Sequence, residues 1–337
     1  MTSRPPGAEA LPPRKRFATQ PCRNGAGRVA PTFLATTLLA TTLLATLGLP
    51  STAWAEGKPA AVERPEQLLG APGSVSIDVN GSDVEVPYAI TTDGYAVLEG
   101  DMIIGGAQEL FQLQKMQEDE ARKTQKLTLA SVDAFQLFGL FDIAGRVWPK
   151  GIVAYRINAN VDADGKKRLD AAMAMWTSTT KIQFVSAVAG TRAYVEFVHA
   201  NNADNCSSEV GFLGRRQLIY MGDNCDAGNM AHEIGHALGL GHEQMRSDQD
   251  KFVTIKTANI MSGYLKFFTP KPWAYVDAGS YCYGSLMHYG PKMFSSNNFP
   301  TIVPKDPSAR IGQRDRVASC DQRVIQAAYQ AQFAARP

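Results

Sequence analysis

Histidine and cysteine, the residues most typical of zinc sites, are scarce in this chain of 337 residues, which holds five of each. No two cysteines form a Cys-x-x-Cys pair, a spacing typical of structural zinc sites, so we expect no cysteine-based zinc site. No stretch combines basic and aromatic residues in the way of a nucleic-acid-binding protein, and we expect no nucleic-acid partner. With 45% apolar and 20% charged residues, the composition is that of a globular protein.

Three of the five histidines stand close together in a metal-binding pattern. His232 and His236 are four residues apart, so on a helix their side chains share one face and can bind one Zn²⁺. A catalytic zinc usually has three protein ligands, and Gly239 permits a left-handed turn that brings His242 back to the metal. Glu233 stands beside the first ligand as the candidate general base. The stretch therefore predicts one zinc per chain, bound by three histidines at a hydrolytic site.

The longer pattern is what separates this stretch from a chance match. A bare His-Glu-x-x-His occurs by chance on unrelated helices, but its extension to Gly239 and His242 is rarely accidental. An inactive, zinc-stabilised binding module is the alternative from another class of protein. Glu233 beside an intact ligand set argues against it. The other two histidines, His199 and His288, belong to no ligand pattern, and we expect structural roles for them.

The first 55 residues are typical of an export signal. Residues 1–28 hold six basic residues and one acidic residue, an apolar run follows at 29–50, and Ala53-Trp54-Ala55 is a small-x-small cleavage pattern. We therefore expect residues 1–55 to be a signal peptide and the mature protein to be secreted, outside the cell or into a periplasm. The apolar run is about long enough to span a membrane, but its threonines and the cleavage pattern argue against a stable anchor.

The rest of the chain divides by charge. Residues 56–140 carry 6 basic and 14 acidic side chains, a net charge of −8, and residues 141–337 carry 22 and 17, a net charge of +5. Opposite net charges favour docking of the first segment on the second. Residues 56–75 are rich in Ala, Pro and Glu and predict a loose linker. Residues 76–98 alternate polar and apolar side chains around Asn80-Gly81, which predicts a β-hairpin.

The zinc-binding stretch resembles the metzincin metallopeptidases, and Glu243, directly after the third histidine, resembles the astacin family among them. Ser285-Leu286-Met287-His288-Tyr289 is similar to the Met-turn of that family. A peptidase of another metzincin family is the alternative, which Glu243 and Tyr289 disfavour. The resemblance continues through three further stretches: Trp148-Pro149-Lys150-Gly151-Ile152, Thr301-Ile302-Val303-Pro304-Lys305 and Ile311-Gly312-Gln313.

The resemblance implies an α+β fold for residues 141–337, the zincin or metzincin catalytic domain. In this fold a twisted, mostly parallel sheet and helices lie above the active-site cleft, and an irregular lower lobe carries a C-terminal helix. The resemblance also implies a zinc-dependent endopeptidase, whose partners are protein or peptide substrates that it hydrolyses with zinc-activated water. We expect a monomer.

The resemblance further implies roles for individual residues near the metal. Tyr289 matches a tyrosine that binds zinc at rest and turns to the oxyanion during turnover. Met287 matches the methionine that forms an apolar floor under the zinc site, a packing role for a soft side chain. Glu243 matches the glutamate that meets the mature N-terminus in a buried polar contact.

A zymogen is also implied. Leu98-Glu99-Gly100-Asp101-Met102 resembles the short pro-segment motif in which an aspartate reaches the zinc, so Asp101 is the expected fourth ligand in the zymogen only. Residues 56–140 are accordingly expected to be a pro-segment that binds the catalytic domain of the same chain. Its boundary, where cleavage would release it, is expected between 126 and 147.

Cysteine usage fits an exported protein. Cys22 lies in the signal peptide, and the remaining four cysteines can form two disulfides in three pairings. The family resemblance implies a Cys206–Cys225 bridge before the zinc helix. Cys282 and Cys320 then remain, and we expect a Cys282–Cys320 bridge that is this chain's own.

Overall fold

The computed structural model describes residues 68–79, 82–121, 146–271 and 276–336, and all of them lie within one compact unit, Ala55–Pro337. The predicted signal peptide and almost all of the predicted cleavage region lie outside the described residues. Within the described ranges, every helix is too short or too polar to cross a membrane.

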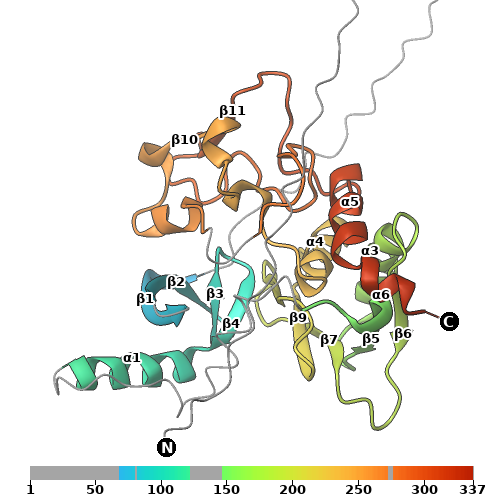
Figure 1. Cartoon of the computed structure of the whole chain (residues 1–337). Coiled ribbons are helices and arrows are strands. Elements are labelled where there is room, and N and C mark those ends of the chain that lie inside the picture. Colours follow the sequence, from blue (N-terminus) through green and yellow to red (C-terminus); the bar gives the residue numbers. More distant parts are fainter. Residues whose placement is uncertain (1–67, 80–81, 122–145, 272–275, 337) are drawn as a thin grey trace, which may run out of the picture. The chain divides into compact units, whose positions relative to one another are not determined.

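The N-terminal segment consists of four antiparallel strands followed by a helix (Figure 1). β1 (Leu68–Val79) and β2 (Ser82–Thr91) form the predicted hairpin, whose tip lies outside the described residues. β3 (Tyr95–Leu98), β4 (Met102–Gly106) and α1 (Ala107–Ala121) follow. The predicted linker at 56–75 is wrong from Leu68 onward, because the strand begins there: backbone pairing to β2 outweighs a composition typical of a linker.

Apolar side chains of these elements pack into a small core of their own. Its innermost members are at most 2% exposed: Val75, Val86, Leu98, Met102 and Leu110. Because the last of these lies on α1, the helix is held against the strands by burial of apolar surface. The N-terminal segment is therefore folded, and its packed strands can hold the loop between β3 and β4 in a fixed position.

The C-terminal segment, residues 141–337, contains a sheet of five strands that is mostly parallel, as predicted. Its strands are β5 (Ile152–Ile157), β6 (Gln183–Ser186), β7 (Tyr194–His199), β8 (Cys206–Glu209) and β9 (Arg216–Met221). In the order β6-β5-β7-β9-β8, all neighbours are parallel except β8, which is antiparallel to β9. On its other side β8 pairs in parallel with β4, so both segments share one nine-stranded sheet.

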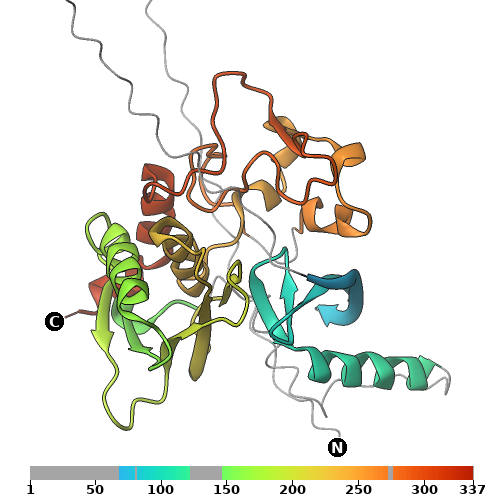
Figure 2. The same cartoon turned by 180° about the vertical axis from the view of Figure 1, so that it is seen from behind.

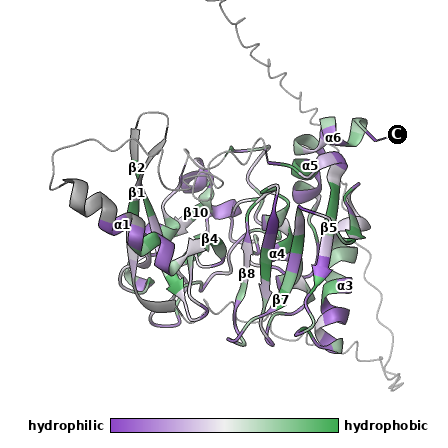
Figure 3. Cartoon of the chain, turned by 90° about the horizontal axis from the view of Figure 1, so that it is seen from below, coloured by the Kyte–Doolittle hydropathy of each residue, from purple (hydrophilic) through white to green (hydrophobic). Residues whose placement is uncertain are grey.

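Two helices pack beside this sheet and position the metal ligands. α3 (Ala163–Thr177) begins at an aspartate cap, because Asp162 Oδ1 accepts a hydrogen bond from Gly165 N at 2.6 Å. α3 lies beside α4 (Ala227–Ala237) in both views (Figures 1 and 2), and the buried Trp176 donates from Nε1 to Ala231 O at 2.8 Å. β5, β7 and α3 each carry both hydrophobic and hydrophilic residues (Figure 3).

After α4 the chain becomes irregular, as predicted for the lower lobe. β10 (Val253–Ile255) pairs with β11 (Ile302–Pro304), and α5 (Ser319–Ala328) and α6 (Gln330–Ala334) come last. Short 3₁₀ helices lie at Pro149–Gly151, Glu243–Met245, Gln249–Lys251, Thr257–Asn259 and Tyr264–Phe268. Strands, long helices and an irregular lower part together confirm the α+β class.

Candidate metal centre

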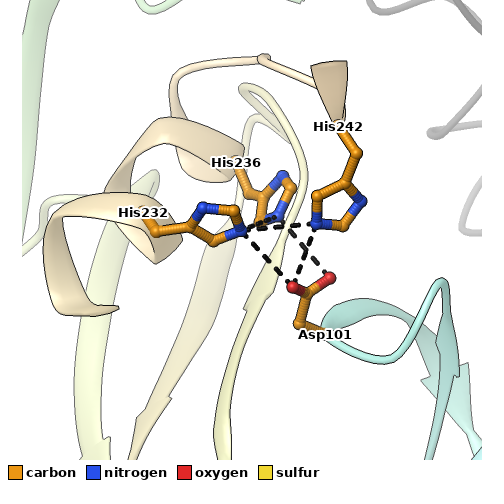
Figure 4. A group of neighbouring side chains, drawn as sticks. All are labelled: Asp101, His232, His236 and His242. Carbon is orange, nitrogen blue, oxygen red and sulfur yellow. Dashed lines mark hydrogen bonds and ion pairs between the residues drawn. The ribbon is translucent and has the colours of Figure 1, made fainter. Parts of the chain in front are cut away.

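Helix α4 begins at an aspartate cap and ends at a glycine. Asp226 Oδ1 accepts a hydrogen bond from Asn229 N at 2.8 Å, which satisfies a donor at the start of the helix. Gly239 has a φ of 96°, a left-handed conformation that glycine adopts without Cβ strain. The chain therefore leaves the helix in the predicted turn and brings His242 back toward the first two histidines (Figure 4).

The three imidazoles converge on one point. The Nε2 atoms of His236 and His242 lie 3.1 and 3.3 Å from Nε2 of His232, and no ring is more than 3% exposed. Each Nδ1 faces an acceptor at 2.8 to 2.9 Å: Leu286 O for His232, Leu240 O for His236 and Glu99 Oε2 for His242. An acceptor at Nδ1 places the N–H there, so the Nε2 of each neutral ring points its lone pair to the shared centre.

Asp101 brings a carboxylate to this point from the N-terminal segment (Figure 4). Its Oδ2 lies 3.1 Å from His242 Nε2 and 3.4 Å from His232 Nε2, and its Oδ1 lies 3.6 Å from His236 Nε2. The four candidate ligand atoms lie within 4.8 Å of one another. Asp101 is 7% exposed, and its Oδ1 accepts no hydrogen bond from the described residues. A buried carboxylate beside three converging lone pairs fits a zinc ion, which would be bound by all four side chains.

Burial keeps two of the imidazoles neutral. It lowers the pKa of His232 well below the usual range and also lowers the pKa of His236. Burial acts against charge on His242 as well, but the carboxylates of Asp101 and Glu99 outweigh it and raise the pKa of His242 to about 9. A metal cation at Nε2 would take the place of that proton.

Glu99 was not predicted from the sequence, yet it contacts two groups of the centre. Its fully buried carboxylate accepts from His242 Nδ1 at 2.9 Å and lies 3.0 Å from Lys271 Nζ. Burial acts to raise the pKa of Glu99, but Lys271 and His242 outweigh it and lower that pKa. The backbone oxygen of Glu99 accepts a hydrogen bond from the Tyr289 hydroxyl. In the sequence Glu99 precedes Gly-Asp, which is typical of an exposed turn, so no local signal pointed to this role.

The Met-turn residues lie around the centre. Tyr289 is fully buried, and its ring centroid is 4.6 Å from that of His242. Its roles as zinc ligand and oxyanion donor stay predictions, because its hydroxyl donates to Glu99 O in this structure. Met287 is 2% exposed, and a Cβ added to Gly235 would lie only 2.5 Å from its Sδ. The methionine therefore packs directly against α4 between the helical ligands, as an apolar floor would.

Glu243 lies in a buried polar environment next to the third histidine. Its Oε1 accepts from Cys282 N at 2.7 Å and lies 3.7 Å from Arg246 Nε. Burial raises the pKa of Glu243 to about 8. Its contact with a mature N-terminus stays a prediction.

Both disulfides are present in the expected pairing. Cys206–Cys225 has an S–S distance of 2.02 Å, and Cys282–Cys320 has one of 2.09 Å. The second bridge joins the chain before the Met-turn to α5. Beside it, Asp321 accepts from Ser285 Oγ at 2.6 Å and Leu286 N at 2.9 Å. These contacts fix the peptide whose carbonyl orients the first imidazole.

The two remaining histidines lie outside the four-ligand group. His288 shares a hydrogen bond of 2.7 Å between its Nε2 and Tyr281 OH, and burial lowers its pKa to about 4. His199 is paired with Asp223 at 2.9 Å in a more exposed position at the end of β7. Both therefore have partners that explain them without a metal.

The chain is similar to known metallopeptidases. A family model described as Astacin, a peptidase family, matches residues 142–330. Zinc metalloproteinase nas-14 of Caenorhabditis elegans is 35% identical over 189 residues, which cover 55% of this chain and 37% of that protein. Nematocyst expressed protein 6 of Nematostella vectensis is 34% identical over 191 residues, which cover 54% of this chain and 65% of that protein. Among solved structures, High choriolytic enzyme 1, a hatching enzyme zinc-protease from Oryzias latipes (medaka), is 28% identical with a TM-score of 0.49 and covers 55% of this chain and 93% of that one.

The chain spans less than two thirds of the length of these two curated relatives. The family match covers more than half of the chain and includes the three histidines, Glu233 and the Met-turn. The resemblance found in the motifs is thereby confirmed over residues 142–330. This chain belongs to the astacin family of metallopeptidases.

Proposed function

We propose that this chain is a zinc-dependent endopeptidase, secreted as an inactive zymogen in which Asp101 blocks the metal. The observation that carries the proposal is the convergence of three buried imidazole nitrogens with a carboxylate from the N-terminal segment (Figure 4). Family membership supports protein or peptide substrates. Export is supported by the N-terminal sequence pattern.

The side chains around the centre can take separate roles in peptide hydrolysis. Bound zinc would supply Lewis-acid activation of the attacking water and of the scissile carbonyl. Glu233 is 2% exposed and follows His232 on α4, so it can take the proton of the water and pass it to the leaving amine. Tyr289, after Glu99 has left, can donate its hydroxyl to the oxyanion.

The blocking residue is carried on the tip of a hairpin. Leu98 pairs with Met102, so residues 99–101 form the three-residue loop between β3 and β4, which we name the inhibitory loop. Gly100 has a φ of 91°, and a Cβ there would lie 2.7 Å from a ring carbon of Phe294. Asp101 O accepts from Ser208 N at 2.9 Å, which holds the loop to β8. Glycine is thus required at the position that lets Asp101 reach the metal.

The N-terminal segment also covers the edge strand of the catalytic sheet. β8 is the last strand of that sheet, and β4 pairs with it through Met102 opposite Ser208 and Ile103 opposite Glu209. An exposed edge strand offers backbone groups to which an extended peptide can bind. With β4 in place those groups are taken, so the zymogen blocks both the metal and a binding edge for substrate.

Activation then requires removal of the N-terminal segment. A cut between residues 126 and 147 would separate it from the catalytic domain and create a new N-terminus. That α-amino group would approach Glu243, whose buried carboxylate a cation stabilises. The opposite net charges of the two segments, −8 and +5, support their association before the cut.

The decisive test is Glu233→Gln in the activated protein. We expect peptide hydrolysis to be abolished while zinc content, measured by elemental analysis, stays at one ion per chain, because Glu233 is not in the four-ligand group. Glu196→Gln, a matched change on β7, should leave the turnover number unchanged. N-terminal sequencing of the exported protein checks the cut.

Wild-type turnover by a folded Glu233→Gln protein would remove Glu233 from the mechanism. A wild-type protein that binds zinc but hydrolyses no peptide would instead favour the inactive binding module.

A further inference from the structure

A second contact between the two segments lies outside the metal centre, at the turn between β2 and β3. Asp93 Oδ1 accepts from the backbone N–H of Asn201 at 3.2 Å, and Asp93 Oδ2 accepts from Asn205 Nδ2 at 2.7 Å. Beside it, Thr92 Oγ1 accepts from Asn202 Nδ2 at 3.2 Å. The donors follow β7 in the loop before β8. None of these residues is a ligand of the metal centre.

The turn that presents Asp93 is fixed by its own hydrogen bonds. Thr91 O accepts from Gly94 N at 3.0 Å, and Thr91 Oγ1 accepts from Tyr95 N at 3.2 Å. Gly94 has a φ of 83°, a conformation that favours glycine. The carboxylate is therefore held in place before it meets the catalytic domain, so little conformational freedom is lost on binding.

The part of the catalytic domain that binds Asp93 is also held in place by its own hydrogen bonds. Asn205 is 1% exposed, its Oδ1 accepts from Ser207 Oγ at 2.7 Å, and its backbone O accepts from Gly222 N at 2.7 Å. It directly precedes the Cys206–Cys225 bridge, which restrains its position further. Both oxygens of Asn205 already accept hydrogen bonds, and its side-chain amide donates to the Asp93 carboxylate. Departure of Asp93 would break the 2.7 Å hydrogen bond that the Asn205 amide donates to its carboxylate.

Further contacts around this turn are equally independent of the metal ligands. The rings of Tyr95 and Tyr220 lie 5.1 Å apart between centroids, and Tyr220 is 9% exposed. The β4–β8 ladder continues the same interface. Contacts that do not involve the metal ligands therefore attach the segment to the catalytic domain, and the Asp93 turn on the loop at 201–205 is one of them.

We propose that the Asn201 backbone N–H and the Asn205 amide form a carboxylate-binding site for Asp93 that, with Asn202 bound to Thr92 beside it, holds the N-terminal segment on the catalytic domain independently of zinc. The cut segment then stays bound after the chain between the segments has been cleaved. Activation has two steps, cleavage and then dissociation, and the cut segment inhibits until it leaves. The inhibitory consequence rests on the proposed function, but the binding itself requires no peptidase activity.

The experiment follows release of the cut segment from the full chain in a Glu233→Gln background, which prevents self-processing. A recognition sequence for a site-specific protease is inserted between Ala130 and Ser131, the chain is immobilised by its C-terminus, and release after the cut is followed by mass spectrometry. Each sample is measured with zinc and with a chelator. Asp93→Ala should speed release about tenfold to a hundredfold, by the same factor in both conditions, because two charge-assisted hydrogen bonds are lost.

Two further variants make the result specific. Glu85→Gln removes an ion pair with Lys266, whose two side chains are 56% and 53% exposed, and should change release less than twofold. Asp93→Asn combined with Asn205→Asp exchanges donor and acceptor and should restore retention relative to Asn205→Asp alone.

Two results would overturn the proposal: a wild-type segment that leaves as soon as the chelator is added, or an Asp93→Ala segment that leaves no faster than the wild type. Because Asp93 lies in a turn, we expect Asp93→Ala to fold, and it tests the proposal even if Asn205→Asp does not fold. If the segment is retained as expected, but the cleaved chain with Glu233 intact hydrolyses no peptide after the segment has left, only the proposed function is refuted.

Discussion

Asp101→Ala should turn the silent zymogen into an active one without any cut in the chain. The lost group is a carboxylate, 7% exposed, that faces three imidazoles and the metal they would bind. Removal of one partner from a buried ionic contact is worth about 3–5 kcal/mol. Since each 1.4 kcal/mol is tenfold in an equilibrium, the open fraction should rise about a hundredfold to a few thousandfold. The variant should still be slower than the activated enzyme, because β4 continues to cover β8.

The assay measures hydrolysis of a quenched fluorescent peptide by uncut zymogen at matched zinc content, together with mass spectrometry of the region 126–147. Asp101→Asn, which keeps the size and loses the charge, should lie between the wild type and Asp101→Ala. Asp101→Ala with Glu233→Gln must be inactive, which excludes a contaminating peptidase. If Asp101→Ala stays as silent and intact as the wild type, Asp101 does not block the metal.

Three further predictions test single contacts. In the activated enzyme, Tyr289→Phe should lower kcat about a hundredfold and leave KM nearly unchanged, because its hydroxyl would act mainly in the transition state; a rise in KM alone would contradict this. Gly100→Ala should raise hydrolysis by uncut zymogen, since its Cβ would meet a buried aromatic ring at 2.7 Å, whereas Gly190→Ala, also at positive φ but with open space, should not. Burial acts to raise the pKa of Glu196, but Arg216 outweighs it and lowers that pKa. Glu196 therefore stabilises the fold above its unfolded pKa and loses that contribution as pH falls through its folded pKa. Glu196→Gln should reduce the loss of unfolding free energy at acidic pH, measured by urea unfolding. An unchanged loss would refute the assignment.

The metal centre could be predicted from the sequence because its geometry is local. A spacing of four residues puts His232 and His236 on one face of any helix, and a glycine at positive φ is needed wherever the chain turns back so soon after α4. β5, β7 and β9 are likewise recognisable in the sequence, because most of their side chains are apolar. β8 is not, because Cys206–Glu209 is short and polar, and only its neighbours make it a strand.

Apart from Asp101 at the three histidines, which the family resemblance implied, the contacts between the segments could not be predicted, because their partners are far apart in the sequence. Glu99 meets His242 across 143 residues, and Asp93 meets Asn205 across 112. Each acidic residue stands beside a glycine, a composition typical of any solvated turn. The opposite net charges predicted that the segments would dock, but net charge does not specify which carboxylate lies where.

The shape of the inhibitory loop explains why a short hairpin can act on the whole centre at once. Glu99 and Gly100 both have positive φ, 55° and 91°, so the chain reverses within the loop and both flanking carboxylates face the catalytic domain. A left-handed glutamate costs roughly 1–2 kcal/mol, which its contacts with Lys271 and His242 can offset. Asp101 thereby faces the three imidazoles while Glu99 holds His242 with its carboxylate and Tyr289 with its carbonyl. Because three consecutive residues hold all of these groups, departure of the loop would free them together, and we expect activation of the proposed zymogen to be all-or-none at each molecule.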